Sequence, residues 1–128
     1  MDAVTAAELH RALDGPITVD ITTTGRRSGE PRRIEIWIVK VGERVLIGGT
    51  PGRRDWIANL RADPRLVVHL KESVVADLPA TATEVDDLEV RREVWTHLST
   101  NWYRGQTPLD ELIADAPLVE LDFDDDVS

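Results

Sequence analysis

Two arginine-rich segments that contain glycine are the parts of this sequence best suited to chemistry. Gly25–Arg33 holds four arginines, and Gly48–Arg54 holds two. A guanidinium group can bind two phosphate oxygens at once, and glycines let backbone amides approach a ligand closely. Each charge-assisted hydrogen bond of this kind contributes about 1.5–3 kcal/mol. The two segments therefore predict a site for an anion of modest size between them, with a pair of ordinary solvated turns as the alternative.

The distribution of charge favours such a site. The formal net charge of −9 argues against a general nucleic-acid binder, because neutralising phosphates requires a positive surface. Residues 26–71 nevertheless carry 11 basic and 5 acidic side chains, a balance of +6, whereas residues 72–128 carry 3 basic and 15 acidic ones, a balance of −12. A positive middle in an acidic chain indicates a local anion site, and surface charge for solubility is the alternative.

Length and composition predict one folded domain over residues 1–128, since 128 residues suit a single core and 41% of them are hydrophobic. The absence of cysteine excludes disulfides, thiolate nucleophiles and thiolate metal sites. His10, His69 and His97 lack metal-ligand spacing, so no metal is predicted. No apolar run approaches the roughly 20 residues of a membrane helix, and the N-terminus lacks the pattern of a signal peptide. We therefore expect a cytoplasmic protein without a membrane span.

The elements that must position the two arginine segments follow from hydrophobic spacing. Alternating side chains predict strands at 17–24, 34–39, 45–47, 65–71 and 118–123. A further hairpin is expected from 74–77 and 80–85, with its turn at Leu78-Pro79. The second arginine segment leads into a helix from Trp56 to about Ala62, capped by Asp55.

Other helices are expected toward the two ends of the chain. A capping-box pattern at Thr5–Glu8 predicts a helix within residues 1–15, and residues 124–128 form an acidic tail. A helix from Asp86 through His97 is predicted to turn a stripe toward the core, made of Leu88, Val90, Val94, Trp95 and Leu98. Residues 99–106 are expected to be irregular, and Thr107-Pro108 to begin a helix that ends near Ala114.

Together these elements predict an α+β fold with six or seven mainly antiparallel strands and a few short helices. Neighbouring antiparallel strands of that number tend to close into a small barrel, because closure removes exposed strand edges. The arginine segments would then lie at strand ends, outside the closed core.

Two segments carry a resemblance to a known family. Thr22–Arg32, with the sequence TTTGRRSGEPR, and Trp56–Pro64, with the sequence WIANLRADP, together resemble the deazaflavin-dependent nitroreductase and quinone reductase family, and the similarity covers roughly Ile17 to Leu70. The resemblance implies a split β-barrel related to FMN-binding proteins, whose loop holds the phosphate of the deazaflavin coenzyme F420, with FMN as the alternative. It also implies an F420H2-dependent oxidoreductase that transfers hydride to a small electron-poor acceptor such as a quinone or nitro compound.

The family pattern assigns residues by position. Arg27 and Arg32 would contact the phosphate or the acidic tail of the cofactor, and the strand end at Gly49-Thr50 would lie beside its ring. The segment before Trp56 is shorter than in the family, so Arg53 or Arg54 would stand in for an expected lysine. Trp56 is equally well interpreted as a core anchor. The residues predicted to bind the cofactor are Arg26, Arg27, Ser28, Gly29, Arg32, Gly49, Thr50, Arg53, Arg54, Trp56 and Asn59.

Three aromatic residues are candidates for the acceptor side of the site, namely Trp37, Trp102 and Tyr103. Trp37 would equally suit barrel packing or the interface of a homodimer, which we expect by analogy with other split barrels. Characterised nitroreductases have several tyrosines near the substrate, whereas this chain has only Tyr103, which argues against nitro reduction. No catalytic acid or base is predicted, because the cofactor carries the chemistry.

Two other classes of function remain open from the sequence. The first is an FMN- or haem-binding protein built on the same barrel. The second is a non-catalytic binding module whose arginines contact an acidic protein partner.

Overall fold

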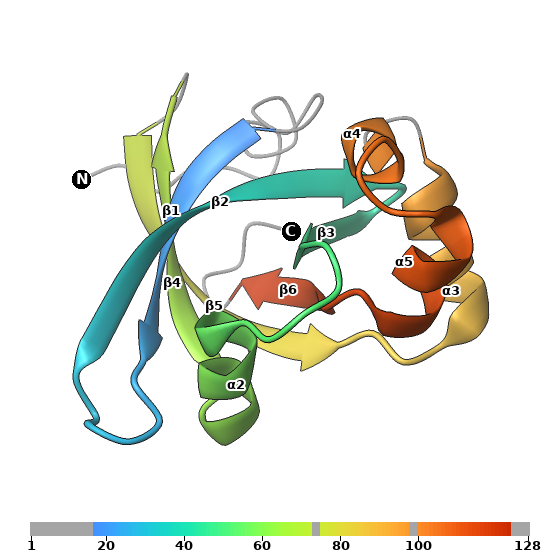
Figure 1. Ribbon diagram of the computed structural model, residues 1–128. Coiled ribbons are helices and arrows are strands. Elements are labelled where there is room, and N and C mark those ends of the chain that lie inside the picture. Colours follow the sequence, from blue (N-terminus) through green and yellow to red (C-terminus); the bar gives the residue numbers. More distant parts are fainter. Residues whose placement is uncertain (1–16, 73–74, 98–99, 124–128) are drawn as a thin grey trace.

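The computed structural model describes residues 17–72, 75–97 and 100–123, and a six-stranded barrel forms its centre (Figure 1). Each strand is antiparallel to its neighbours, and β4 pairs back to β1 so that the ring closes in the order β1-β2-β3-β6-β5-β4. The strands are β1 (Ile17–Thr24), β2 (Pro31–Val41), β3 (Arg44–Gly48), β4 (Arg65–Lys71), β5 (Val75–Glu84) and β6 (Leu118–Phe123). The small antiparallel barrel predicted from hydrophobic spacing is confirmed. The helix expected within residues 1–15 and the acidic tail at 124–128 lie outside the described residues.

The helices of the described part occupy two separate places on the barrel. They are α2 (Asp55–Ala62), α3 (Leu88–Thr96), α4 (Asn101–Arg104) and α5 (Leu109–Asp115). Figure 1 shows α3, α4 and α5 gathered at one side of the barrel, whereas α2 lies apart from them, near the loop that joins β1 to β2. None of these helices has the length and apolar character needed to cross a membrane.

Apolar side chains form two cores. The first fills the barrel, where alternate residues of each strand point inward, as Val19 and Ile21 of β1 do. The second lies between the outer faces of β2 and β3 and the group of α3, α4 and α5, and it includes Val39, Leu46 and Trp95. Part of β2 is therefore covered on both faces, which explains its continuous apolar run.

The predicted hairpin at Leu78-Pro79 is wrong, because β5 runs unbroken through both residues. Leu78 pairs with Val68 and Pro79 pairs with Val67 on β4. Among the described residues, pairing of β5 with β6 begins only at Ala80. Within the described residues, Pro79 pairs with β4 only, and a proline, which lacks an N–H group, is tolerated where one side of a strand is unpaired.

The first arginine segment is less of a loop than predicted. Strand β2 begins at Pro31, so Arg32 and Arg33 are strand residues that pair with Thr23 and Thr22 of β1. Only residues 25–30 form the turn, and the N–H group of Gly25 donates to the carbonyl of Glu30 over 2.8 Å. The arginines are therefore held on a rigid hairpin end and not on an open loop.

Three helix starts differ from the predictions by small amounts. Asp55 is the first residue of α2 and makes no cap, since Arg54 occupies the N-cap position without a side-chain hydrogen bond. The N-cap of α5 is Pro108 rather than Thr107. The segment predicted to be irregular contains the short helix α4.

Helix α3 is capped by Asp87, and its first turn faces the core less than predicted. The carboxylate of Asp87 accepts hydrogen bonds from the N–H groups of Glu89 and Val90. Leu88, predicted to face the core, is 63% exposed. Val90 is partly buried and packs against the second core, as predicted, and the fully buried stripe consists of Arg91, Val94 and Trp95. Leu98 lies outside the described residues.

Candidate functional site

One surface hollow brings the first arginine segment against α2. Its volume is about 640 Å³, and all four arginines of Gly25–Arg33 line it. We call it the arginine hollow, and its lining residues are Thr23, Gly25, Arg26, Arg27, Ser28, Pro31, Arg32, Arg33, Ile34, Asp55, Trp56 and Asn59. The hairpin end of β1 and β2 forms one wall and the first turns of α2 form the other, so this helix packs against the turn.

Two of the four arginines are already engaged by the protein. Arg26 donates from its backbone and from its guanidinium to Oδ1 of Asn59, over 3.1 and 3.0 Å, and its guanidinium lies 3.3 Å from the carboxylate of Asp55. Arg33 donates to the carboxylate of Asp20 over 2.9 Å. These bonds fix the turn and the start of β2, and they largely neutralise both cations.

Arg27 and Arg32 are free of such partners. Both side chains are exposed, and neither makes a hydrogen bond or an ion pair with any residue in the ranges 17–72, 75–97 and 100–123. Two unengaged guanidinium groups at one hollow can bind a dianion such as a phosphate from two directions. The hollow therefore fits a phosphorylated cofactor.

The tight turn between β1 and β2 depends on its glycines and on Ser28. A Cβ atom at Gly25 would lie 2.8 Å from Oγ of Ser28 and 3.1 Å from the carbonyl oxygen of Glu30. Gly29 has a φ of +71°, which few other residues adopt. Oγ of Ser28 accepts from the N–H group of Glu30, and the N–H group of Gly29 donates to the carbonyl of Gly25. Gly29 thus uses its amide within the turn instead of offering it to a ligand.

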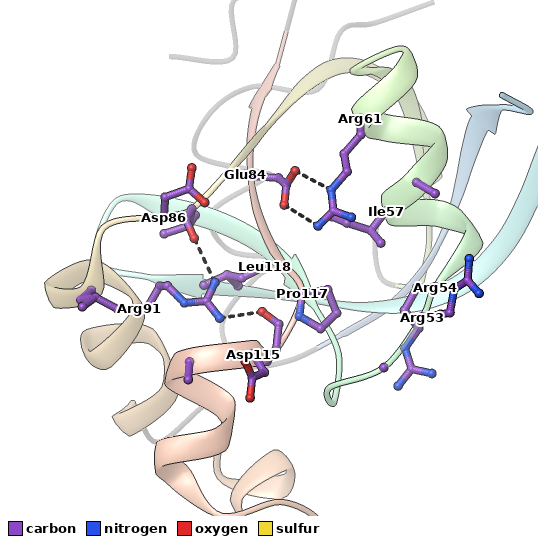
Figure 2. A pocket seen from close by; sticks show the side chains of 16 residues that line it. Arg53, Arg54, Ile57, Arg61, Glu84, Asp86, Arg91, Asp115, Pro117 and Leu118 are labelled. Atoms are coloured by element: carbon purple, nitrogen blue, oxygen red, sulfur yellow. Dashed lines mark hydrogen bonds and ion pairs between the residues drawn. The ribbon is translucent and has the colours of Figure 1, made fainter.

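The second arginine segment does not reach the arginine hollow. Arg53 and Arg54 line another hollow, of about 460 Å³, together with Ile57, Ala58 and Arg61 from α2 (Figure 2). Asp55, Trp56 and Asn59 line the arginine hollow, so α2 separates the two sites. The structure therefore places the two arginine segments in different hollows and does not set one anion between them.

Most cations of this second hollow are occupied by protein groups. Arg61 binds both carboxylate oxygens of Glu84 over 2.7 and 3.0 Å, and Arg54 donates to the carbonyl and hydroxyl oxygens of Thr50 over 3.0 and 2.7 Å. Across the hollow from Arg61 lies Arg91, whose guanidinium is bonded to main-chain carbonyls (Figure 2). Of these arginines only Arg53 lacks a partner within the described segments, which makes the arginine hollow the better anion site.

Arg91 is a structural residue that sequence reasoning missed. It is 7% exposed, and its guanidinium donates to the carbonyls of Val85, Leu112, Ile113 and Ala116. Burial lowers the pKa of this guanidinium from its usual value. Its spacing of three and four residues from Val94 and Trp95 was the available signal, because that spacing places all three on one helix face.

The predicted acceptor-side residues lie together. The ring centroids of Trp37 and Trp102 are 5.4 Å apart, and the ring of Tyr103 lies 5.2 Å from that of Trp102 and 6.4 Å from that of Trp37. Trp37 is 39% exposed and Trp102 is 53% exposed, whereas Tyr103 is buried. Burial raises the pKa of the Tyr103 phenol, so it remains neutral at physiological pH.

A shallow depression lies between Trp102, one member of this aromatic group, and Thr50. It has a volume of about 350 Å³ and is lined by Thr50, Pro51, Trp102, Gln106, Thr107 and Glu111. Arg54 packs along the other side of the strand end, since a Cβ atom at Gly49 would lie 3.5 Å from its Nε. Thr50 therefore lies between the arginine of the second segment and the exposed face of Trp102.

A closed six-stranded antiparallel barrel with an arginine-lined hollow beside its first hairpin defines a split-barrel protein equipped to bind an anionic group. Residues 2–109 match the family model described as F420H(2)-dependent quinone reductase. The chain belongs to this family, so its cofactor is F420 and it is an F420H2-dependent oxidoreductase. The family, the cofactor and the enzyme class predicted from the TTTGRRSGEPR and WIANLRADP motifs are confirmed.

Solved structures agree with this fold. One described as a domain-swapped dimer is 26% identical, with a TM-score of 0.57, over 82% of this chain and 79% of that chain. An F420-H2 dependent reductase (FDR-A) is 22% identical, with a TM-score of 0.55, over 82% and 93% of the two chains. A pyridoxinephosphate oxidase family protein from Clostridium acetobutylicum is 14% identical, with a TM-score of 0.67, over 96% and 86%. The similarities to the F420-H2 dependent reductase and to the pyridoxinephosphate oxidase family protein are evidence for the fold only.

Proposed function

We propose that the arginine hollow binds the phosphate or the acidic tail of F420, with Arg27 and Arg32 as its principal ligands. This proposal rests on one observation, that within the described segments only two of the four arginines are paired with protein groups. Arg26 and Arg33 are paired with protein groups, whereas Arg27 and Arg32 are free of partners among the described residues and line the same hollow. Unengaged guanidinium groups can bind an anion without first giving up a protein partner.

The remaining residues of the predicted set have supporting roles in this proposal. Ser28 and Gly29 shape the turn, Trp56 anchors α2 in the barrel core, and Arg26 holds the turn against that helix. F420 in its reduced form supplies the hydride when it is bound. Gly49 and Thr50 would lie beside its ring, with Arg54 fixing the conformation of this strand end and Arg53 available to a second anionic group.

We further propose that the acceptor is a small electron-poor molecule, with quinones favoured over nitro compounds, and that it binds at Trp37, Trp102 and Tyr103. A flat acceptor can stack on the exposed tryptophan rings. The Tyr103 phenol, kept neutral by its raised pKa, can donate a hydrogen bond to an acceptor oxygen. The depression beside Thr50 lies between Trp102 and the segment assigned to the cofactor ring.

Binding titrations test the assignment of the arginine hollow. Arg27→Ala and Arg32→Ala are each expected to weaken F420 binding by about 10- to 100-fold, because one charge-assisted contact contributes about 1.5–3 kcal/mol and 1.4 kcal/mol corresponds to a factor of ten. Fluorescence titration with F420 measures the loss. FMN and haem, titrated in parallel, are expected to bind more weakly than F420.

Arg92→Ala is the matched control, because it removes the same charge from the exposed face of α3, away from the hollow. Its affinity for F420 should equal that of the wild type, and circular dichroism should show an unchanged fold for all variants. Wild-type affinity in the R27A/R32A double variant would show that the phosphate is held elsewhere.

We also propose a homodimer. One similar solved structure is described as a domain-swapped dimer, and β2 exposes Ile34 and Trp37, whose side chains are 36% and 39% exposed. Large apolar side chains that remain exposed in one protomer are suited to a contact with a second copy. Sedimentation velocity of the full chain is the corresponding measurement.

A further inference from the structure

The side chain of Asn59 connects three parts of the arginine hollow. It lies on α2 and is 3% exposed. Its Oδ1 accepts two hydrogen bonds from Arg26, one from the backbone N–H group over 3.1 Å and one from the guanidinium over 3.0 Å. Its Nδ2 donates to Oγ1 of Thr23, at the end of β1, over 3.2 Å. One buried amide thus joins helix, strand and turn.

This arrangement leaves Asn59 poorly placed to bind a ligand itself. Its oxygen already accepts two hydrogen bonds, which is the usual capacity of an amide carbonyl. Its nitrogen is turned toward Thr23, inside the protein. The family resemblance places Asn59 among the cofactor contacts, whereas these bonds indicate that its amide serves the protein.

We propose that Asn59 is a positioning residue, which orders the turn that carries Arg27 without holding the cofactor. The inference rests on the proposed function of the arginine hollow. Arg27 follows Arg26 directly, so fixing the N–H group of Arg26 limits the directions that the next side chain can take. A turn that is already ordered spares the conformational entropy that binding would otherwise cost.

Asparagine suits this position because both of its amide atoms are used. Alanine would leave the hydroxyl of Thr23 and the backbone N–H group of Arg26 without their partner, and both lie in a part-buried or buried setting. Aspartate would keep the acceptor for Arg26 but lose the donor for Thr23. The two substitutions therefore separate the anchoring of the turn from the bond to β1.

A double-mutant cycle between Asn59→Ala and Arg27→Ala tests the inference through F420 affinity. N59A alone is expected to weaken binding about 10-fold, which corresponds to one ordering contact. If Asn59 acts by orienting Arg27, most of that loss disappears in the R27A background, and the double variant binds within about 2-fold of R27A, the range of ordinary additivity error. Equal losses in both backgrounds would indicate direct contact with the cofactor and overturn the inference.

Hydrogen exchange of the cofactor-free protein supplies a readout that does not depend on binding. The amides of residues 25–30 should exchange faster in N59A, whereas N59D, which keeps the acceptor for Arg26, should retain protection near the wild-type level. Wild-type protection of the turn in N59A would also overturn the inference. N59D keeps the test available if N59A does not fold.

Arg61→Ala is the matched control on the same helix, since Arg61 points to the opposite side of α2 and forms an exposed ion pair with Glu84. It should leave F420 affinity and turn protection unchanged. The outcomes also separate this inference from the proposed function. If R27A binds F420 as tightly as the wild type, the arginine hollow is not the phosphate site. If R27A weakens binding and N59A does not, only the role of Asn59 is wrong.

Discussion

Arg91 is a buried cation that makes its hydrogen bonds to main-chain carbonyls. Its four acceptors belong to the end of β5, to α5 and to the segment between α5 and β6, so one side chain holds three pieces of chain together. The lowered pKa of the guanidinium reflects the cost of burying its charge. Such a group stabilises the fold only while all of its donors are used.

Arg91→Ala is therefore expected to lower the free energy of unfolding by about 3–5 kcal/mol, since removing a buried charged partner leaves polar groups unsatisfied. Urea denaturation measures this change. Arg91→Lys is the control, because lysine keeps the charge but cannot reach four carbonyls, and an intermediate loss is expected. A loss below about 1 kcal/mol in R91A, typical of a surface position, would contradict this account.

The same residues show what a sequence can reveal about single side chains. Arg27 and Arg32 were predicted as cofactor ligands from the glycine-rich motif, because such a role depends on local spacing, and this role stays a prediction. Arg91 and the amide of Asn59 act through partners 21 to 36 residues away along the chain, apart from the nearby Val85. No local pattern reveals such partners, and the separation of Arg53 and Arg54 from the arginine hollow likewise depends on where α2 lies.

Strands β1, β2 and β4 are linked on their outer faces by a chain of ion pairs centred on Asp20. Its carboxylate lies 2.9 Å from Nε of Arg33 and 2.7 Å from Nζ of Lys71, and Lys71 also binds Glu35. The hydrogen bond from Lys71, followed by that from Arg33, lowers the pKa of Asp20 below its ordinary 3.8. The Asp20 carboxylate is therefore ionised at neutral pH.

This lowered pKa predicts a dependence of stability on acid. A group whose pKa is lower in the folded state stabilises the fold above its unfolded pKa, and that contribution is lost as the pH falls through the folded pKa. The urea concentration at the midpoint of unfolding should stay constant from neutral pH to about pH 4 and should decrease below that pH. In the Asp20→Asn variant, this midpoint should decrease less steeply below that pH. An identical slope in the two proteins would show that Asp20 is not the cause.

Strand positions were well predicted where periodicity alone decides them. The strands at 17–24, 65–71 and 118–123 agree with β1, β4 and β6 to the residue. The error at Leu78-Pro79 arose because a proline normally signals a turn, whereas its tolerance here depends on which neighbours β5 has at that position. Such information lies in the sheet order and not in the strand itself.

At the scale of the whole molecule, the arginine hollow and the exposed tryptophans lie in separate regions. The arginine hollow lies between the first hairpin and α2, whereas Trp37 and Trp102 belong to the region where β2 meets the group of α3, α4 and α5. The assignment of residues 1–128 to a single domain stays a prediction.

Trp102→Ala tests the aromatic side of this arrangement. Losing the exposed ring should raise the KM for a quinone several-fold, because stacking of aromatic pairs contributes about 0.5–1.5 kcal/mol, while F420 affinity stays unchanged. Steady-state kinetics with varied quinone gives the first quantity and titration the second. Sedimentation of the variant separates the alternatives, since conversion of a dimer to a monomer would assign this surface to protein contact.

Arg27 and Arg32 also have a consequence for the protein before any ligand arrives. Two like charges at one hollow, neither of which forms an ion pair with a described residue, repel each other. Replacing either arginine relieves that repulsion, so the R27A and R32A variants should each have a slightly higher Tm than the wild-type protein. In the proposed function, stability and cofactor binding are therefore opposed at these two positions, as is common at ligand-binding sites.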